Sequence, residues 1–172
     1  MSDDRSGEER TTWRWGEVFE VDLPASLMVK DLGDAVELAP LVTDAPEHLA
    51  SSPEARIHLA VLSPLPTDPA TSVRDAIQRF ATGHGLAELP ASHLEVHAAS
   101  PGIATGRLAF VVADTAWLVL ALAWSSHLVL VFTTAPGPSD PIFDRAEALL
   151  ADIRPLEVVA PGAVEPDAPG EF

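Results

Sequence analysis

Three side chains that could bind a metal ion lie two residues apart near the middle of the chain: His93, Glu95 and His97. If this segment is a strand, the three side chains share one face, with about 7 Å between successive Cβ atoms. Imidazole and carboxylate groups bind zinc and other transition metals, although such sites usually take their ligands from separate elements. The spacing therefore leaves two hypotheses open, a metal site or a solvated strand face.

The residues of most other catalytic mechanisms are missing. The chain contains neither cysteine nor tyrosine, which excludes disulfides, thiolate nucleophiles and phenolic acid catalysis. Its one lysine, Lys30, lies outside any glycine-rich phosphate loop, and no Gly-x-Ser-x-Gly motif occurs. His84 stands between two glycines at the expected end of a helix. Three further histidines are isolated, at His48, His58 and His127. We therefore predict no catalytic residue and no cofactor.

Two pairs of tryptophans differ in their expected surroundings. Trp13 and Trp15 lie on one side of the chain just before the first predicted strand, where they either cover an edge of the core or form an exposed patch. Because tryptophan supplies much of the binding energy of many interfaces, these two residues are the predicted partner-binding site. Trp117 and Trp124 have opposite parity in one apolar strand, so we expect them to pack on opposite faces of the sheet.

The charge of the chain is strongly negative. With 26 acidic residues against 10 lysine and arginine residues, the formal net charge is −16. Such a surface repels phosphate backbones and anionic lipids, so we expect neither nucleic-acid binding nor membrane binding. Residues 165–172 are acidic and end in an aromatic residue. They leave open an alternative in which the acidic C-terminal tail is a docking peptide for another protein.

Short alternating segments predict β-strands. Residues 17–22, 26–31 and 35–41 follow one another closely, which is typical of an antiparallel meander. A loop rich in proline, serine and glutamate, at residues 43–54, precedes a further strand at 55–63. Residues 94–98 also alternate, and a turn is expected between Gly102 and Gly106. These strands are the first part of an antiparallel sheet.

Capping residues and apolar periodicity predict two helices. Asp68 followed by Pro69 is typical of a helix start, and apolar residues then recur every three or four positions up to Ala81. The second helix begins at Ser139 or Asp140, each followed closely by a proline at position 141, and ends before position 155. Each helix has one apolar stripe, so each is expected to pack against a sheet.

Residues 107–135 are almost entirely apolar, which raises the alternative of a membrane span. A transmembrane helix needs about 20 uninterrupted apolar residues, whereas Asp114 and the polar residues 125–127 divide this region. Three buried strands, at 108–113, 116–124 and 128–133, fit the pattern better. With the two helices they predict an α+β fold in which helices cover both faces of an antiparallel sheet, an α/β/α sandwich.

The order of these elements defines the expected domain organisation. Residues 1–15 are predicted to be a flexible lead-in, 16–156 a single α+β domain, and 157–172 a disordered acidic tail rich in proline. The polar N-terminal residues lack the apolar stretch of a secretory signal. We therefore expect a cytoplasmic protein.

Several segments, in this order, resemble a known superfamily. They are the opening Phe19-Glu-Val-Asp-Leu-Pro24, a strand ending in prolines, the helical segment 72–80, three apolar strands, Thr134-Ala-Pro136 and the closing Leu150-Ala-Asp-Ile-Arg-Pro155. Over residues 15–156 the chain resembles the PsbP/DcrB-like superfamily, which includes a photosystem extrinsic subunit, envelope lipoproteins, a Ran-binding import factor and chaperones of type VI secretion effectors. The resemblance implies an α/β/α sandwich that binds another protein and has no catalytic residue to carry over.

These observations lead to one main hypothesis about function. It is a non-enzymatic protein-binding domain, an adaptor or chaperone, and it rests on the resemblance together with the missing catalytic residues. A small metal-dependent enzyme or ligand carrier that uses His93, Glu95 and His97 is the first alternative. Docking of the acidic tail on another protein is the second.

Overall fold

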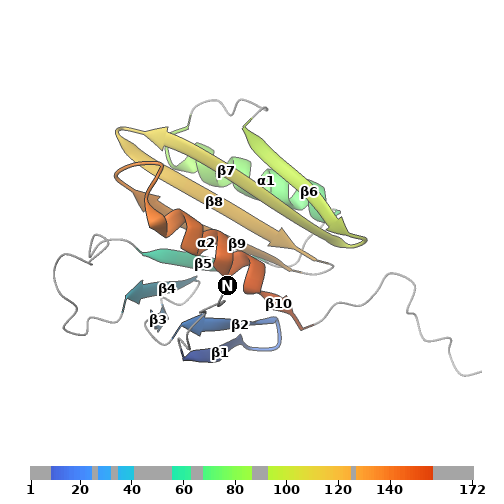
Figure 1. The fold of residues 1–172 in the computed structure, drawn as a ribbon. Coiled ribbons are helices and arrows are strands. Elements are labelled where there is room, and N and C mark those ends of the chain that lie inside the picture. The colour runs from blue at the N-terminus through green and yellow to red at the C-terminus, as the bar shows by residue number, and fades with distance from the viewer. Residues whose placement is uncertain are drawn as a thin grey trace, which may run out of the picture.

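The structure is a computed structural model, and it describes most of the chain between residues 9 and 156. The described ranges are 9–24, 27–31, 35–40, 56–62, 68–86, 93–124 and 127–156. Figure 1 shows their helices and strands. The expected loop at 43–54 and the expected tail at 157–172 lie outside these ranges.

Ten strands and two helices occur within the described ranges. The strands are β1 (Arg10–Trp15), β2 (Phe19–Pro24), β3 (Leu27–Asp31), β4 (Ala35–Pro40), β5 (Ile57–Leu62), β6 (Leu94–Ser100), β7 (Ile103–Val112), β8 (Thr115–Ala123), β9 (Leu128–Ala135) and β10 (Arg154–Pro155). The helices are α1 (Pro69–Gly83) and α2 (Pro141–Asp152). Of these two helices, neither is long and apolar enough to cross a membrane.

The strands form two antiparallel sheets. A seven-stranded sheet has the order β3-β4-β5-β9-β8-β7-β6, and a three-stranded sheet has the order β1-β2-β10. Neighbouring strands run antiparallel throughout. Strands β7, β8 and β9 are the three strands expected from the apolar region 107–135. The sequence-based prediction of a mixed α+β fold is confirmed.

Alternate residues of β8 pack into two separate apolar clusters. Leu118, Leu120 and Leu122 join the cluster that contains α2 and β2. Val119 and Ala121 join the cluster that contains α1. Because the side chains of successive strand residues point to opposite faces, β8 is apolar at nearly every position only if both faces are buried. This explains why the region lacks the alternation of a half-exposed strand.

Both helices begin at the expected residues. The Asp68 carboxylate accepts hydrogen bonds from the Thr71 backbone N–H at 3.1 Å and from the Thr71 hydroxyl at 2.7 Å. The Asp140 carboxylate accepts one from the Ile142 N–H at 2.9 Å. Each cap is followed by a proline. Proline has no backbone N–H, and at the first position of a helix none is needed because that group has no partner within the helix. His84 forms the C-terminal cap of α1, as its place between two glycines indicated.

Gly106 allows α1 to approach β7 closely. A Cβ atom at this position would meet Val73 Cγ1 and, at 2.8 Å, Ile77 Cδ1 on the helix. The sequence predicted a turn bounded by Gly102 and Gly106. This prediction is wrong for Gly106, which lies inside strand β7. Of the two glycines, only Gly102, with a φ of +83°, has the left-handed backbone that a turn glycine adopts.

The N-terminal part of the fold differs from the expectation in two ways. Residues Arg10–Trp15 form strand β1, although they were expected to belong to a flexible lead-in. Strand β2 pairs with β1 and β10 in the small sheet, and does not continue into β3 as an antiparallel meander would. The polar residues of β1 are exposed, which explains why its sequence lacks the apolar alternation of the other strands.

Candidate functional site

Trp13 and Trp15 form an aromatic cluster with Phe19 on one face of the three-stranded sheet. The ring centroids of the two tryptophans lie 5.7 Å apart, and each lies about 6 Å from Phe19, at 6.1 and 5.9 Å. Phe19 is fully buried, whereas both tryptophans are half-buried at the margin of the apolar cluster that contains α2 and β2. The two rings thus cover the core and remain partly accessible.

Charged residues on strands β2 and β10 hold the three-stranded sheet together. The Arg154 guanidinium donates hydrogen bonds to Asp22 at 2.9 and 3.1 Å and to Glu20 at 3.2 Å. The Thr12 hydroxyl donates a further one to Asp22 at 2.6 Å. Arg154 and then Thr12 lower the pKa of Asp22 to about 2. In return, Asp22 and Glu20 raise the pKa of Arg154 above its ordinary value.

Strand β1 is an edge of this sheet, and among the described strands it pairs only with β2. An edge strand presents backbone N–H and C=O groups that an extended segment of another protein can pair with. On β1, Arg10 and Arg14 are exposed and alternate with the two tryptophans, so their side chains point to the opposite face of the strand. Half-buried aromatic rings beside a strand edge are features that protein-binding surfaces use.

The structure places His93, Glu95 and His97 along an exposed strand, not in a metal centre. His93 immediately precedes β6, and Glu95 and His97 lie within it, all three exposed. In the register with β7, Glu95 lies opposite Arg107 and His97 lies opposite Thr105. Among the described residues, no three His, Asp or Glu side chains come together to hold a metal ion.

A buried carboxylate that sequence reasoning missed lies on β4. Glu37 is 7% exposed, and its carboxylate oxygens lie 2.9 Å from Arg56 Nη1 and 3.2 Å from His58 Nε2. Two partners within hydrogen-bond distance satisfy this buried carboxylate, so the evident role of the cluster is to stabilise the pairing of β4 with β5. The signal in the sequence is weak, because Glu37 and His58 are far apart and become neighbours only through the β4–β5 register.

His58 begins a row of rings that crosses the seven-stranded sheet beneath the end of α1. His58 stacks on Phe132 at 5.0 Å between ring centroids, and Phe132 lies 4.7 Å from Phe80 of α1. Phe80 in turn stacks on His84 at 4.1 Å, and His84 lies 4.9 Å from Trp117. The row joins β5, β9, α1 and β8, so its evident role is to dock the C-terminal end of α1 on the sheet.

An open hollow of about 370 Å³ lies along α1. Its lining comprises Asp75, Gln78, Arg79 and Thr82, none of which the sequence indicated as functional. Because the described residues that line it include no aromatic ring and no buried polar side chain, this part of the hollow lacks the features of a ligand pocket.

Comparison with known proteins identifies the fold. No family model matches the chain, and no curated protein matches its sequence. The structure is similar to the Saccharomyces cerevisiae Ran-binding protein Mog1p, with a TM-score of 0.58 and 9% identity over 88% of this chain and 97% of that chain. It is also similar to a point mutant of the protein Mog1, with a TM-score of 0.57 and 10% identity over 87% and 97%. The chain therefore has a Mog1-like fold.

Proposed function

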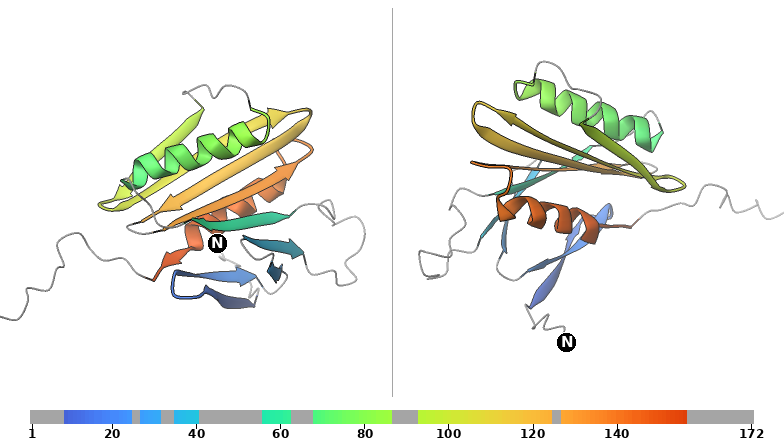
Figure 2. Two further views of the ribbon diagram at one scale, coloured as in Figure 1. Left: turned by 180° about the vertical axis from the view of Figure 1, so that it is seen from behind. Right: turned by 45° about the horizontal axis from the view of Figure 1, so that its top comes forward.

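We propose that this chain is a non-enzymatic, cytoplasmic protein-binding domain that acts as an adaptor or chaperone. The observation that carries the proposal is the fold shared with Mog1p, a Ran-binding protein, across nearly the whole of that chain. The proposed architecture is the α/β/α sandwich of the PsbP/DcrB-like superfamily. Its support is the packing of α1 and α2 against alternate residues of β8, with the strands between them in Figure 2.

The proposed binding surface is β1 with Trp13 and Trp15. Both rings pack against Phe19, which fixes their orientation before a partner arrives and lowers the entropy lost on binding. Each ring is half-buried, so a partner can cover the part that remains accessible. The open edge of β1 adds main-chain groups to the same surface.

The test is affinity capture of the partner from native cytosol, followed by titration of the purified pair. We expect the double substitution Trp13→Ser and Trp15→Ser to weaken partner binding by about tenfold or more, or about 1.4 kcal/mol. Trp117→Ser is the matched control, because Trp117 is also half-buried but lies in the ring row on β8. It should leave affinity unchanged.

Folding is measured alongside binding because both tryptophans contact Phe19. Each single variant and the double variant are compared with the wild-type chain by near-ultraviolet circular dichroism and thermal melting. A folded double variant that binds the partner with wild-type affinity would show that β1 is not the binding surface. If the double variant unfolds, the two single variants are used instead, because each removes only one ring. Folded single variants that both bind the partner with wild-type affinity would likewise show that β1 is not the binding surface.

A further inference from the structure

The outer edge of β6 differs from the other sheet edges. Among the described strands, β6 pairs only with β7 and so ends the seven-stranded sheet. Soluble proteins usually protect such edges from other chains with lysine, proline or other charged residues. The edge strand β1 carries Arg10 and Arg14, and the edge strand β3 carries Lys30. Strand β6 contains no lysine, arginine or proline, and its one charged side chain, Glu95, lies opposite Arg107 of β7.

The hairpin of β6 and β7 is also electrically neutral on a very acidic chain. Residues 93–113 contain one acid, Glu95, and one base, Arg107, whereas the whole chain has a formal charge of −16. Two copies of such a chain repel each other over most of their surface. The neutral hairpin is where a second copy can approach with little repulsion.

We propose that two copies of this chain pair antiparallel through β6, around a two-fold axis at Val96. In this register, Glu95 of each copy lies opposite His97 of the other, and Leu94 lies opposite Ala98. Residues Leu94–Ala98 pair regularly with β7, and the irregularity of β6 lies beyond them, between Ala98 and Ser100. The pairing therefore uses the regular part of the strand.

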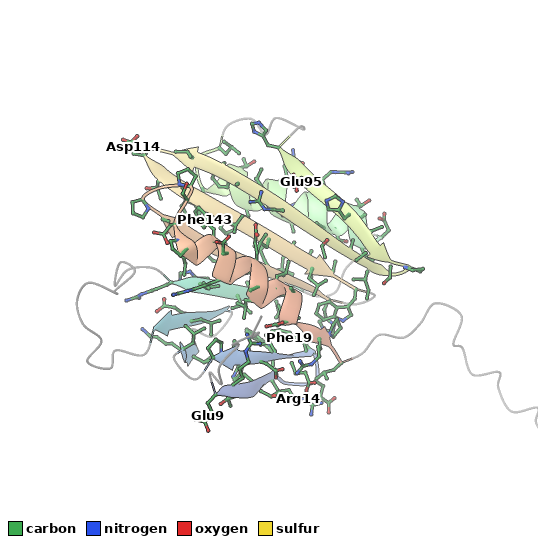
Figure 3. All side chains as sticks on the ribbon, viewed as in Figure 1. Glu9, Arg14, Phe19, Glu95, Asp114 and Phe143 are labelled. Carbon is green, nitrogen blue, oxygen red and sulfur yellow. The ribbon has the colours of Figure 1, made fainter. Side chains whose placement is uncertain are left out.

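Charge complementarity selects this register over its neighbours. A two-fold axis at Glu95 would place the two Glu95 carboxylates opposite each other, and an axis at His97 would do the same for the two imidazoles. Two carboxylates directly opposite on a sheet repel each other, whereas a carboxylate opposite an imidazole accepts a hydrogen bond from its N–H. The axis at Val96 instead forms two Glu95–His97 pairs. Figure 3 marks Glu95 on this strand.

The two faces of β6 fit this pairing. Leu94 and Val96 are half-buried and pack against the cluster that contains α1, so apolar side chains would meet on that face. Glu95 and His97 are exposed on the other face. There Glu95 lies opposite Arg107 in the β7 register, and Arg107 Nε donates to Glu147 of α2 at 2.6 Å. Glu95 would thus lie between Arg107 of its own chain and His97 of the second copy.

The experiment is analytical ultracentrifugation of the full chain with EDTA, in buffer with enough salt to screen the net charge. We expect a concentration-dependent dimer between about 10 μM and about 1 mM, because the interface is small. Glu95→Lys should raise the dissociation constant by about tenfold, since it removes the carboxylate that accepts the imidazole N–H of His97 from the second copy.

Two further variants make the result specific. The double variant Glu95→Lys with His97→Glu again joins opposite charges, and should restore dimerisation. Asp144→Lys, an equal charge change at an exposed position of α2, should leave it unchanged. In hydrogen–deuterium exchange, amides of β6 should exchange more slowly at the higher protein concentration.

Four results would overturn the proposal. These are a monomer across the whole concentration range, a Glu95→Lys variant that dimerises like the wild type, a double variant that does not recover, or β6 amides whose exchange ignores concentration. A dimer that forms only when EDTA is left out would also overturn it. That result would indicate a metal ion bridging the histidines and glutamates of two copies.

Discussion

At the scale of single residues, Asp22 has the carboxyl group that its surroundings change most clearly. Arg154 and Thr12 lower its pKa to about 2 from an ordinary value of 3.8. Because the folded-state pKa is below the unfolded one, the contribution of Asp22 to stability is fully present above about pH 4 and is lost as the pH falls towards 2. Acid therefore weakens the contact between β2 and β10.

Replacing Arg154 with glutamine tests this contact. We expect Arg154→Gln to raise the pKa of Asp22 towards its ordinary value, because the guanidinium that favours the ionised form is removed. An NMR titration of the Asp22 carboxyl carbon measures the shift. Arg145→Gln, at an exposed position of α2, is the control and should leave Asp22 unchanged. An unchanged Asp22 in the Arg154 variant would show that the ion pair does not form in solution.

At the scale of elements, the packing of α1 on β7 depends on the missing side chain at position 106. We expect Gly106→Ala to lower the free energy of unfolding by about 1–3 kcal/mol, because the new methyl group would overlap Val73 and Ile77. Gly83→Ala is the matched control, since a Cβ atom there meets nothing within 4 Å. Urea denaturation measures both variants. Equal free energies of unfolding for the two variants would show that α1 moves away from β7 to make room for the methyl group without loss of stability.

The sequence predicts the strong local signals of the fold well. The two Asp-Pro helix starts lie where they were expected, and the apolar region forms the three expected strands, although β7 begins at Ile103 and not at 108. Caps and apolar runs are properties of short segments, which is why the sequence shows them. Strand β1 was missed because its side chains are mostly polar and its stability comes from pairing with β2. The Glu37–His58 contact was missed for the same reason, because only the strand register brings the two residues together.

The candidate site follows the same pattern. The sequence indicated Trp13 and Trp15 from residue type and spacing alone, and left open whether they cover the core or face a partner. The structure shows that both rings pack against the core and are only partly buried, so part of each ring remains accessible. Phe19, which orients both rings, lies across a hairpin and could not be assigned to them without the β1–β2 register.

At the scale of the whole molecule, the two proposed surfaces are compatible with each other. The three-stranded sheet and the β6 edge lie at different ends of the molecule in Figures 1 and 2. Pairing of two copies through β6 would therefore leave Trp13 and Trp15 of both copies accessible. Such a dimer would present two partner-binding surfaces, which increases the strength of attachment to a partner that is itself multivalent.

The proposed binding role is tested most directly by hydrogen–deuterium exchange of the chain alone and bound to its captured partner. We expect amides of β1, Arg10–Trp15, to exchange more slowly in the complex, because a partner that covers both tryptophans also shields the strand that carries them. The backbone amides of Phe80 and Trp117, which belong to the row of rings beneath α1, should exchange at the same rate in both states. Slower exchange confined to other described elements, with β1 unchanged, would contradict the proposed surface.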